Sequence, residues 1–129
     1  MSDALVPASP TDEIPTMDPS ALTRLERFGG KKLLVEMIAL YQAAAPERLG
    51  AASAGVATGD IAATELALHS LKSSSAQLGA ARLGRLSEKG ETIARAGTLL
   101  GVAEIIRDME DELVRVNEWL TGVRGSVTS

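Results

Sequence analysis

Apolar residues between positions 33 and 52 recur every three or four residues, which is the spacing of one face of an α-helix. These positions are Leu33, Leu34, Met37, Ile38, Tyr41, Ala45, Leu49 and Ala52. Pro46 lies inside the pattern. Because proline lacks a backbone N–H donor, we expect the helix to kink or split just before it. The pattern therefore predicts one long helix with a bend, ending at the Thr-Gly-Asp sequence at 58–60.

A shorter helix is predicted before this one. Asp18 is a suitable cap and Pro19 suits the first helical position, so the helix begins there and ends near Gly29 and Gly30. Residues 1–16 contain three prolines and no helical period. They are therefore interpreted as a flexible tail.

Three further helices follow from the remaining pattern. Asp60 caps a helix over 61–78, which Gly79 ends. A fourth helix covers about 81–96 and a fifth about 102–120. The fifth has the clearest apolar stripe, formed by Val102, Ile105, Ile106, Met109, Leu113, Val116 and Leu120.

The fold class predicted from these elements is all-α. No segment alternates apolar and polar residues as a strand does, and the short connections favour antiparallel neighbours. We expect an antiparallel up-down four-helix bundle with a short extra N-terminal helix, over residues 17–123. Residues 124–129 are small and polar and are expected to form a flexible C-terminal tail.

Composition narrows the functional classes. The 129 residues are 45% hydrophobic but only 2% aromatic, so the core must be built from aliphatic side chains. A net charge of −4 without a basic cluster argues against nucleic-acid binding. The absence of cysteine excludes disulfides and cysteine-ligated zinc. No apolar run reaches the ~20 residues of a membrane helix, and the N-terminal residues lack the basic start and long apolar region of a secretory signal, so a cytoplasmic location is expected.

His69 is the only histidine in the chain. On a helical wheel it lies opposite Leu71 and Leu78, so its imidazole is expected on the exposed face. The residues that share this face are Ala62, Glu65, Lys72, Ser73 and Ala76. Most of them are short, which leaves the ring accessible to another protein. Lys72 lies one turn further on, where its ammonium would stabilise a phosphoryl group carried by the ring.

Glu91 is expected at the height of His69 on the neighbouring helix. His69 precedes Gly79 by ten residues, roughly 15 Å of helix, and Glu91 follows it by twelve, roughly 18 Å. A carboxylate beside an imidazole accepts the proton of one ring nitrogen and leaves the other as a nucleophile. The hypothesis is a contact between these two side chains.

The stretch HSLKSSSAQLGAARLGRLSEKGE, residues 69–91, resembles the signature of histidine-containing phosphotransfer (HPt) domains. His69 matches the phosphorylated histidine and Lys72 the lysine that assists the phosphoryl group. Glu91 matches the position at which the family places Glu or Gln against the ring. The similarity extends over about residues 18–122.

Three positions depart from the family pattern. Ser73 replaces a usual glycine, which adds a small side chain to the surface that a partner approaches. Ser87 replaces a cysteine. Gly90 replaces a leucine just before Glu91 and weakens the helix by up to ~1 kcal/mol relative to alanine.

The resemblance implies a phosphocarrier rather than an enzyme. His69 would accept a phosphoryl group from an aspartyl phosphate on the receiver domain of a hybrid histidine kinase. It would pass the group to the receiver of a response regulator. The chain would bind no cofactor itself, and Mg²⁺ would belong to the receiver. A stand-alone monomer is expected, with Ala62, Glu65, Leu66, Ser73 and Ala76 as the partner-binding surface.

Three other interpretations are open for this sequence. A metal site at His69 and Glu65 is disfavoured because the chain has no second histidine and no cysteine. A phosphorylation-independent adaptor would bind a signalling partner through the surface around Ala62, Leu66, Ser73 and Ala76. A dimerisation module would pair the apolar stripe of the fifth helix between two chains.

Overall fold

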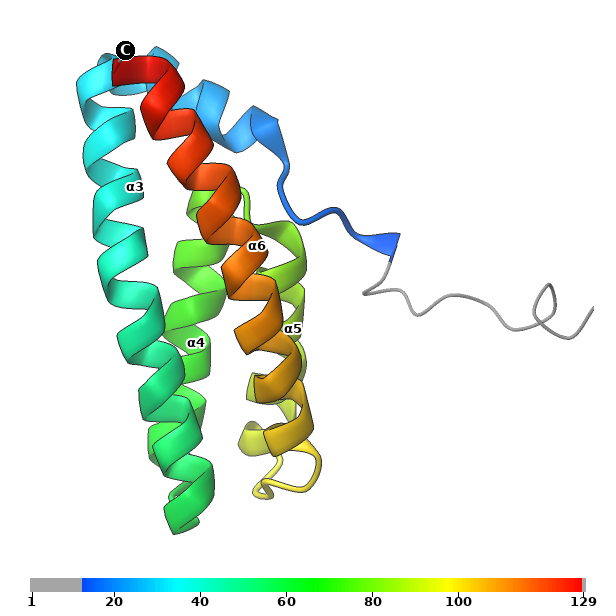
Figure 1. Cartoon of the computed structure of the whole chain (residues 1–129). Coiled ribbons are helices and arrows are strands. Elements are labelled where there is room, and N and C mark those ends of the chain that lie inside the picture. Colours follow the sequence, from blue (N-terminus) through cyan, green and yellow to red (C-terminus); the bar gives the residue numbers. More distant parts are fainter. Residues whose placement is uncertain (1–12, 129) are drawn as a thin grey trace, which may run out of the picture.

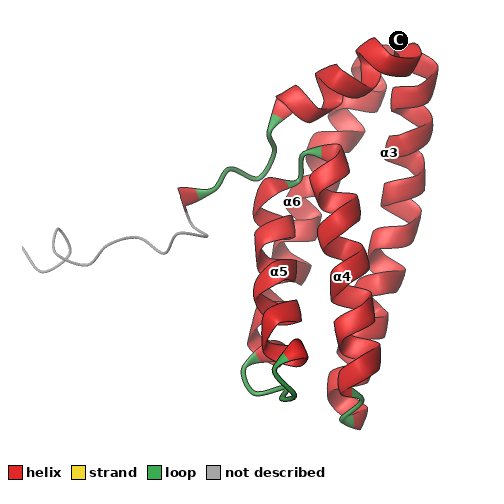
Figure 2. Cartoon of the chain, turned by 180° about the vertical axis from the view of Figure 1, so that it is seen from behind, coloured by secondary structure: helices red, strands yellow, loops and turns green. Residues whose placement is uncertain are grey.

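A computed structural model describes residues 13–128, which contain four long helices and no strand. The helices are α3 (Pro19–Thr58), α4 (Ile61–Leu78), α5 (Ala81–Arg95) and α6 (Val102–Thr128). Each helix packs against two others, α3 and α5 both contacting α4 and α6, which closes a four-helix bundle (Figures 1 and 2). The predicted all-α, antiparallel up-down bundle is therefore confirmed.

The short N-terminal helix is present as the first part of α3. Gly30 has φ 79° and ψ −176°, which breaks the helical backbone, and a glycine adopts this positive φ without a steric penalty. The segment before Gly30 lies across one end of the bundle (Figure 1). Its cap is the predicted one, because Asp18 Oδ1 accepts a hydrogen bond of 3.0 Å from the Ser20 backbone N–H.

Helix α3 does not split at Pro46, so the prediction of one long helix through this position is correct. The only non-helical dihedral angles inside α3 are those of Gly30, and the helix continues through Pro46 to Thr58. Proline has no backbone N–H, so the carbonyl of Gln42 has no donor at its usual helical position. Pro46 is exposed, so this carbonyl lies on the side of the helix that water can reach. The missing hydrogen bond is therefore not left unsatisfied in the core.

Helix α4 has the predicted bounds. Asp60 Oδ1 caps it by accepting from the Ala63 N–H at 3.0 Å, and Gly79 ends it with φ 83°. Helix α5 ends at Arg95, one residue before the predicted end.

Helix α6 is longer than predicted. It continues past Leu120 to Thr128, so residues 124–128 belong to the helix and do not form the separate tail expected from their composition. A contact between distant segments holds this part of α6 to α3: Arg124 Nη1 donates to Gln42 Oε1 at 2.9 Å.

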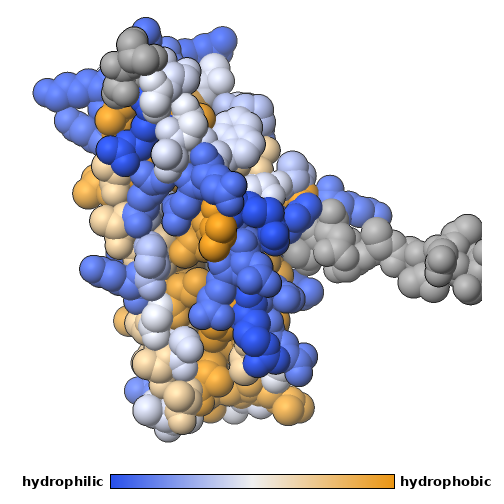
Figure 3. Space-filling view, in the orientation of Figure 1, coloured by the Kyte–Doolittle hydropathy of each residue, from blue (hydrophilic) through white to orange (hydrophobic). Residues whose placement is uncertain are grey.

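The apolar stripe of α6 is part of the core of the bundle. Its buried members are Val102, Ile106, Met109, Leu113, Val116 and Leu120. Figure 3 shows apolar residues along the seam between α3 and α6 and hydrophilic side chains over much of the rest of this face. Because the stripe is covered within one chain, it is not available to pair with a second chain. The stripe therefore gives no support to the dimerisation module.

The segment before α3 is bound to the turn between α4 and α5. Arg82 Nε donates to the Ile14 carbonyl at 2.8 Å, and the Asp18 N–H donates to the Gly79 carbonyl at 2.7 Å. The flexible tail predicted over residues 1–16 therefore ends earlier, because residues 14 and 15 already hydrogen-bond to the bundle. The prediction for residues 1–12 lies outside the described residues.

Candidate functional site

His69 lies on the exposed face of α4, as the helical wheel predicts. Its side chain is 54% exposed, whereas Leu68 and Leu71 beside it are buried. Ser75 on the opposite face is buried, and its hydroxyl shares a hydrogen bond of 2.9 Å with the hydroxyl of Tyr41 on α3. Burial raises the pKa of Tyr41 to about 12, so this bond joins two neutral groups. The buried face thus fixes the rotation of α4 and leaves the imidazole outward.

The predicted contact between His69 and Glu91 is present. His69 Nδ1 lies 2.6 Å from Glu91 Oε2, across the α4–α5 interface. Gly90 explains how the two helices approach this closely: a Cβ at that position would lie 2.8 Å from Leu68 Cδ1, which is buried. A side chain at this position would therefore require Leu68 or α5 to shift.

The Glu91 carboxylate is buried and surrounded by cationic groups. Its side chain is 2% exposed; Oε1 lies 3.0 Å from Lys72 Nζ, and Oε2 also accepts from Arg95 Nη2 at 2.6 Å. Burial by itself would raise the pKa of this carboxyl. Hydrogen bonds from Lys72 and His69, with the positive charges of Lys72 and Arg95, outweigh burial and hold the pKa of Glu91 below its usual value. The group is therefore a carboxylate at neutral pH.

The charge of Glu91 determines which ring nitrogen carries the proton. A carboxylate only accepts hydrogen bonds, so Nδ1 of His69 must be the donor. The lone pair then lies on Nε2, and with the side chain 54% exposed this nitrogen is available to an incoming partner. The arrangement is that of an oriented imidazole nucleophile.

Arg95 is a site residue that sequence reasoning missed. It bridges two carboxylates, because Nη2 donates to Glu91 and Nε donates to Glu65 Oε1 at 3.3 Å. The signal available in the sequence was its spacing of four residues from Glu91, which places both on one side of α5. Many such pairs occur on helix surfaces, so the spacing alone did not distinguish it.

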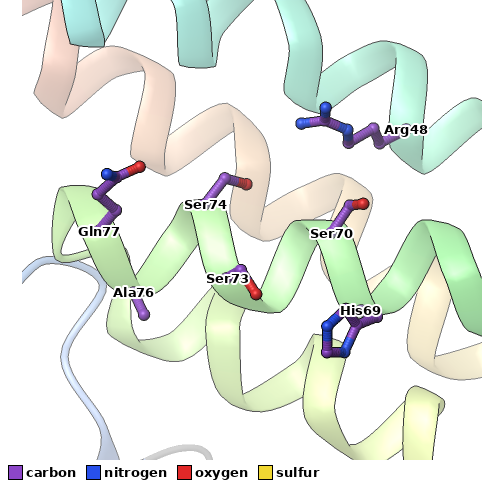
Figure 4. Close-up of a pocket in the computed structure, with 7 residues that line it drawn as sticks. All are labelled: Arg48, His69, Ser70, Ser73, Ser74, Ala76 and Gln77. Atoms are coloured by element: carbon purple, nitrogen blue, oxygen red, sulfur yellow. The ribbon is translucent and has the colours of Figure 1, made fainter.

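Two hollows flank His69 on the surface of α4. One, of about 410 Å³, is lined by His69 with Ala62, Glu65, Leu66, Glu91 and Arg95. The other, of about 630 Å³, lies between α3 and α4 and is lined by His69 with Arg48, Ser70, Ser73, Ser74, Ala76 and Gln77 (Figure 4). All five residues predicted for partner binding line one of these hollows, so the structure brings them together around the ring.

Residues 13–128 contain neither a metal-binding cluster nor a membrane-spanning helix. No group of three or more His, Asp or Glu side chains there is placed to hold a metal ion. No helix in that range is long and apolar enough to cross a bilayer.

An exposed imidazole held by a buried carboxylate on the next antiparallel helix of a four-helix bundle is the arrangement expected of a histidine phosphotransfer domain. The family model of the Hpt domain matches residues 36–119, which is more than half of the chain. The chain therefore belongs to the Hpt domain family, and its role is in phosphotransfer within phosphorelays.

Two solved structures resemble this one. Histidine-containing phosphotransfer protein B from Pseudomonas aeruginosa PAO1 is 26% identical, with a TM-score of 0.83, and the match covers 87% of this chain and 96% of that one. The HPT domain from a Shewanella sensor hybrid histidine kinase is 18% identical, with a TM-score of 0.72 over 88% and 97% of the two chains, and it supports the fold alone. No curated protein matches the sequence.

Proposed function

We propose that the chain is a phosphocarrier in which His69 accepts a phosphoryl group from a receiver-domain aspartyl phosphate and passes it to an aspartate of a second receiver. The observation that carries this proposal is the 2.6 Å contact between His69 Nδ1 and Glu91 Oε2, which holds the half-exposed ring by one nitrogen and keeps Nε2 out of that contact. The match to the Hpt domain over residues 36–119 supports the same function.

The transfer step balances with the groups that the site holds. The Nε2 lone pair attacks phosphorus, the N–P bond forms, and the bond from phosphorus to the aspartyl oxygen breaks, which releases a carboxylate on the donor. The proton on Nδ1 stays there, so the phosphorylated ring becomes an imidazolium whose positive charge faces Glu91. In the second transfer an acceptor carboxylate attacks phosphorus, and the ring leaves as a neutral imidazole.

Lys72 is proposed to stabilise the phosphoryl group. Its ammonium contacts Glu91 Oε1 at 3.0 Å and its side chain is about one third exposed, so it lies beside the ring and at the surface. A dianionic phosphoryl group on Nε2 would attract it, because charge-assisted hydrogen bonds to phosphate are strong. Glu91 holds the ammonium near this position before the group arrives.

The partners proposed are receiver domains, one on a hybrid histidine kinase and one on a response regulator. They would dock on the surface around His69 formed by Ala62, Glu65, Leu66, Ser73 and Ala76. Mg²⁺ is proposed to belong to the receiver, with the present chain acting as a monomeric carrier rather than an enzyme. The burial of the α6 stripe within the bundle supports the monomer.

The test is phosphotransfer from labelled receiver domains of the source organism to the purified protein. Wild type should acquire acid-labile, base-stable label, and His69→Gln should acquire none. His69 is the only histidine, so a phosphohistidine detected in wild type identifies the site directly. If no receiver transfers label but one binds both proteins equally, the phosphocarrier proposal fails and a phosphorylation-independent adaptor takes its place.

A further inference from the structure

Arg48 is a charged residue beside the site that the proposed function does not use. It is exposed on α3 and forms no hydrogen bond or ion pair with any residue in the described part of the chain. Its side chain leaves α3 on the side that faces α4, opposite Ser70, Ser74 and Gln77 (Figure 4). A guanidinium without an internal partner remains available for an external anion.

The hollow that contains Arg48 differs in charge from the hollow on the other side of His69. Its lining combines the guanidinium with hydroxyl and amide groups and includes no carboxylate. The opposite hollow contains Glu65 and Glu91, whose charges Arg95 already pairs. On the α3 side of the imidazole, the hollow therefore contains a guanidinium and no carboxylate to pair with it.

The same hollow continues along α3 into an apolar region. A second hollow of about 250 Å³ shares Arg48, Ser74 and Gln77 with the first and is also lined by Met37 and Leu40. Leu40 is 65% exposed. The two together form one surface, called here the α3–α4 groove, which extends from His69 past Arg48 to Leu40.

We propose that the α3–α4 groove is a docking surface for the receiver, with Arg48 as a specificity-determining residue that selects partners carrying an acidic segment beside the phosphoaspartate. The segment would place a carboxylate on Arg48 and an apolar side chain against Leu40. The proposal rests on the proposed function, because a receiver whose phosphoryl group reaches Nε2 must cover the surface continuous with His69.

The charge of the whole chain strengthens this choice of partner. With a net charge of −4, the protein repels an acidic surface over most approaches, so one unneutralised arginine beside the ring favours a particular orientation. Charges at the rim of an interface act mainly on association rate, salt dependence and partner choice. Arg48 is therefore expected to affect docking and not the chemistry on phosphorus.

The experiment measures transfer from a phosphorylated receiver that labels wild type, with Arg48→Glu as the test variant. Arg107→Glu is the matched control, because Arg107 is also exposed, lies on α6, which does not contact α4, and the substitution changes the net charge equally. Labelling with the small donor phosphoramidate, which needs no docking surface, shows that His69 is intact in every variant.

We expect Arg48→Glu to lower kcat/KM about tenfold, through KM, with kcat within about twofold of wild type. Leu40→Ala should also raise KM, and Arg107→Glu should behave as wild type. Added salt should slow wild type more than Arg48→Glu.

Two results would overturn the role of Arg48 and leave the proposed function standing. One is an equal KM in wild type, Arg48→Glu and Arg107→Glu, and the other is an Arg48→Glu protein in which only kcat is lowered. A wild-type protein that takes no label from any receiver overturns the proposed function as well.

Discussion

At the scale of single residues, the two oxygens of Glu91 have separate partners. Oε1 faces Lys72, while Oε2 accepts from both the His69 ring and Arg95. The carboxylate therefore positions the imidazole and holds a lysine beside it at the same time. Removing it affects the tautomer of the ring first, because Nδ1 loses the acceptor that selects its protonated form.

Glu91→Ala tests this orientation. In wild type, ¹⁵N NMR of the imidazole should show the Nδ1–H form, and the variant should show a mixture of tautomers. Loss of a hydrogen bond to a charged group is worth about 2 kcal/mol, so transfer from a receiver should slow by roughly 30-fold. Glu110→Ala, on the exposed side of α6, is the control and should change neither measurement. An unaltered tautomer in Glu91→Ala would contradict the role assigned to the carboxylate.

The lowered pKa of Glu91 predicts a dependence of stability on pH. A carboxyl whose pKa is lower in the folded than in the unfolded chain contributes stability above its unfolded pKa, near the ordinary value of 4.5. That contribution is lost as pH falls through the lower, folded pKa. Urea unfolding of wild type and Glu91→Gln between about pH 7 and pH 3 should show a steeper acid loss in wild type. Parallel curves for the two proteins would show that the group does not contribute in this way.

At the scale of elements, the distance between α4 and α5 depends on Gly90. Glycine inside a helix usually lowers the stability of the helix, and the sequence alone supports only that interpretation of Gly90. In the structure the missing side chain is what allows Leu68 to lie against α5. The same close approach brings Glu91 within reach of His69.

Gly90→Ala and Gly84→Ala form a matched pair on α5. A Cβ at Gly84 would lie 3.6 Å from the nearest side-chain atom, an ordinary contact, so alanine there should stabilise the fold by about 0.5–1 kcal/mol. A Cβ at Gly90 would lie 2.8 Å from Leu68 Cδ1, and overpacking of about 1–3 kcal/mol should exceed the gain in helix propensity. Urea denaturation measures both. If Gly90→Ala raises the free energy of unfolding as much as Gly84→Ala does, the α4–α5 interface accommodates the extra methyl group without loss of stability.

The elements that sequence predicted well are those whose signals are local. Asp60 and Gly79 cap α4 through neighbours in the chain, and both ends of that helix were correct. The end of α6 was missed because its contact, Arg124 with Gln42, joins residues 82 positions apart. The helix continues through Pro46 without splitting because the missing backbone hydrogen bond lies on the exposed side of α3.

The candidate site shows the same division. His69, Lys72 and Glu91 follow from helical spacing together with a known family pattern, whereas Arg95 and Arg48 do not. Arg95 belongs to the site because both carboxylates that it bridges converge there. Arg48 lies on a different helix, and only packing of α3 on α4 brings it beside the ring. No local sequence motif indicates that Arg95 or Arg48 lies at the site.

At the scale of the whole molecule, Arg82 connects the beginning of the described chain to its last helix. It donates to the Ile14 carbonyl and lies 3.5 Å from the buried carboxylate of Glu112 on α6. Arg115 also pairs with Glu112, and Oε2 of that carboxylate has no hydrogen-bond partner within the described residues. The ion pair therefore stabilises a charge that the core would otherwise leave poorly compensated.

Arg82→Ala should lower the free energy of unfolding by about 1–3 kcal/mol. The loss is smaller than for a carboxylate with one cationic partner, because Arg115 still pairs with Glu112. Arg85→Ala on the same helix removes only an exposed pair with Glu88 and should change stability by less than about 0.5 kcal/mol. Urea denaturation at neutral pH compares the two variants. If both substitutions change the free energy of unfolding equally little, the charge of Glu112 is stabilised without Arg82.

Under the proposed function, the fixed orientation of His69 limits how the chain can serve two receivers. Glu91 holds one ring nitrogen inside the α4–α5 interface, so only Nε2 faces outward, on one side of the bundle. A donor and an acceptor receiver must then occupy the same surface in turn and cannot bind together. The two compete for the carrier, so an acceptor present in excess would delay the carrier's own loading. The abundance of each receiver, relative to this protein, would thus set the rate of the relay.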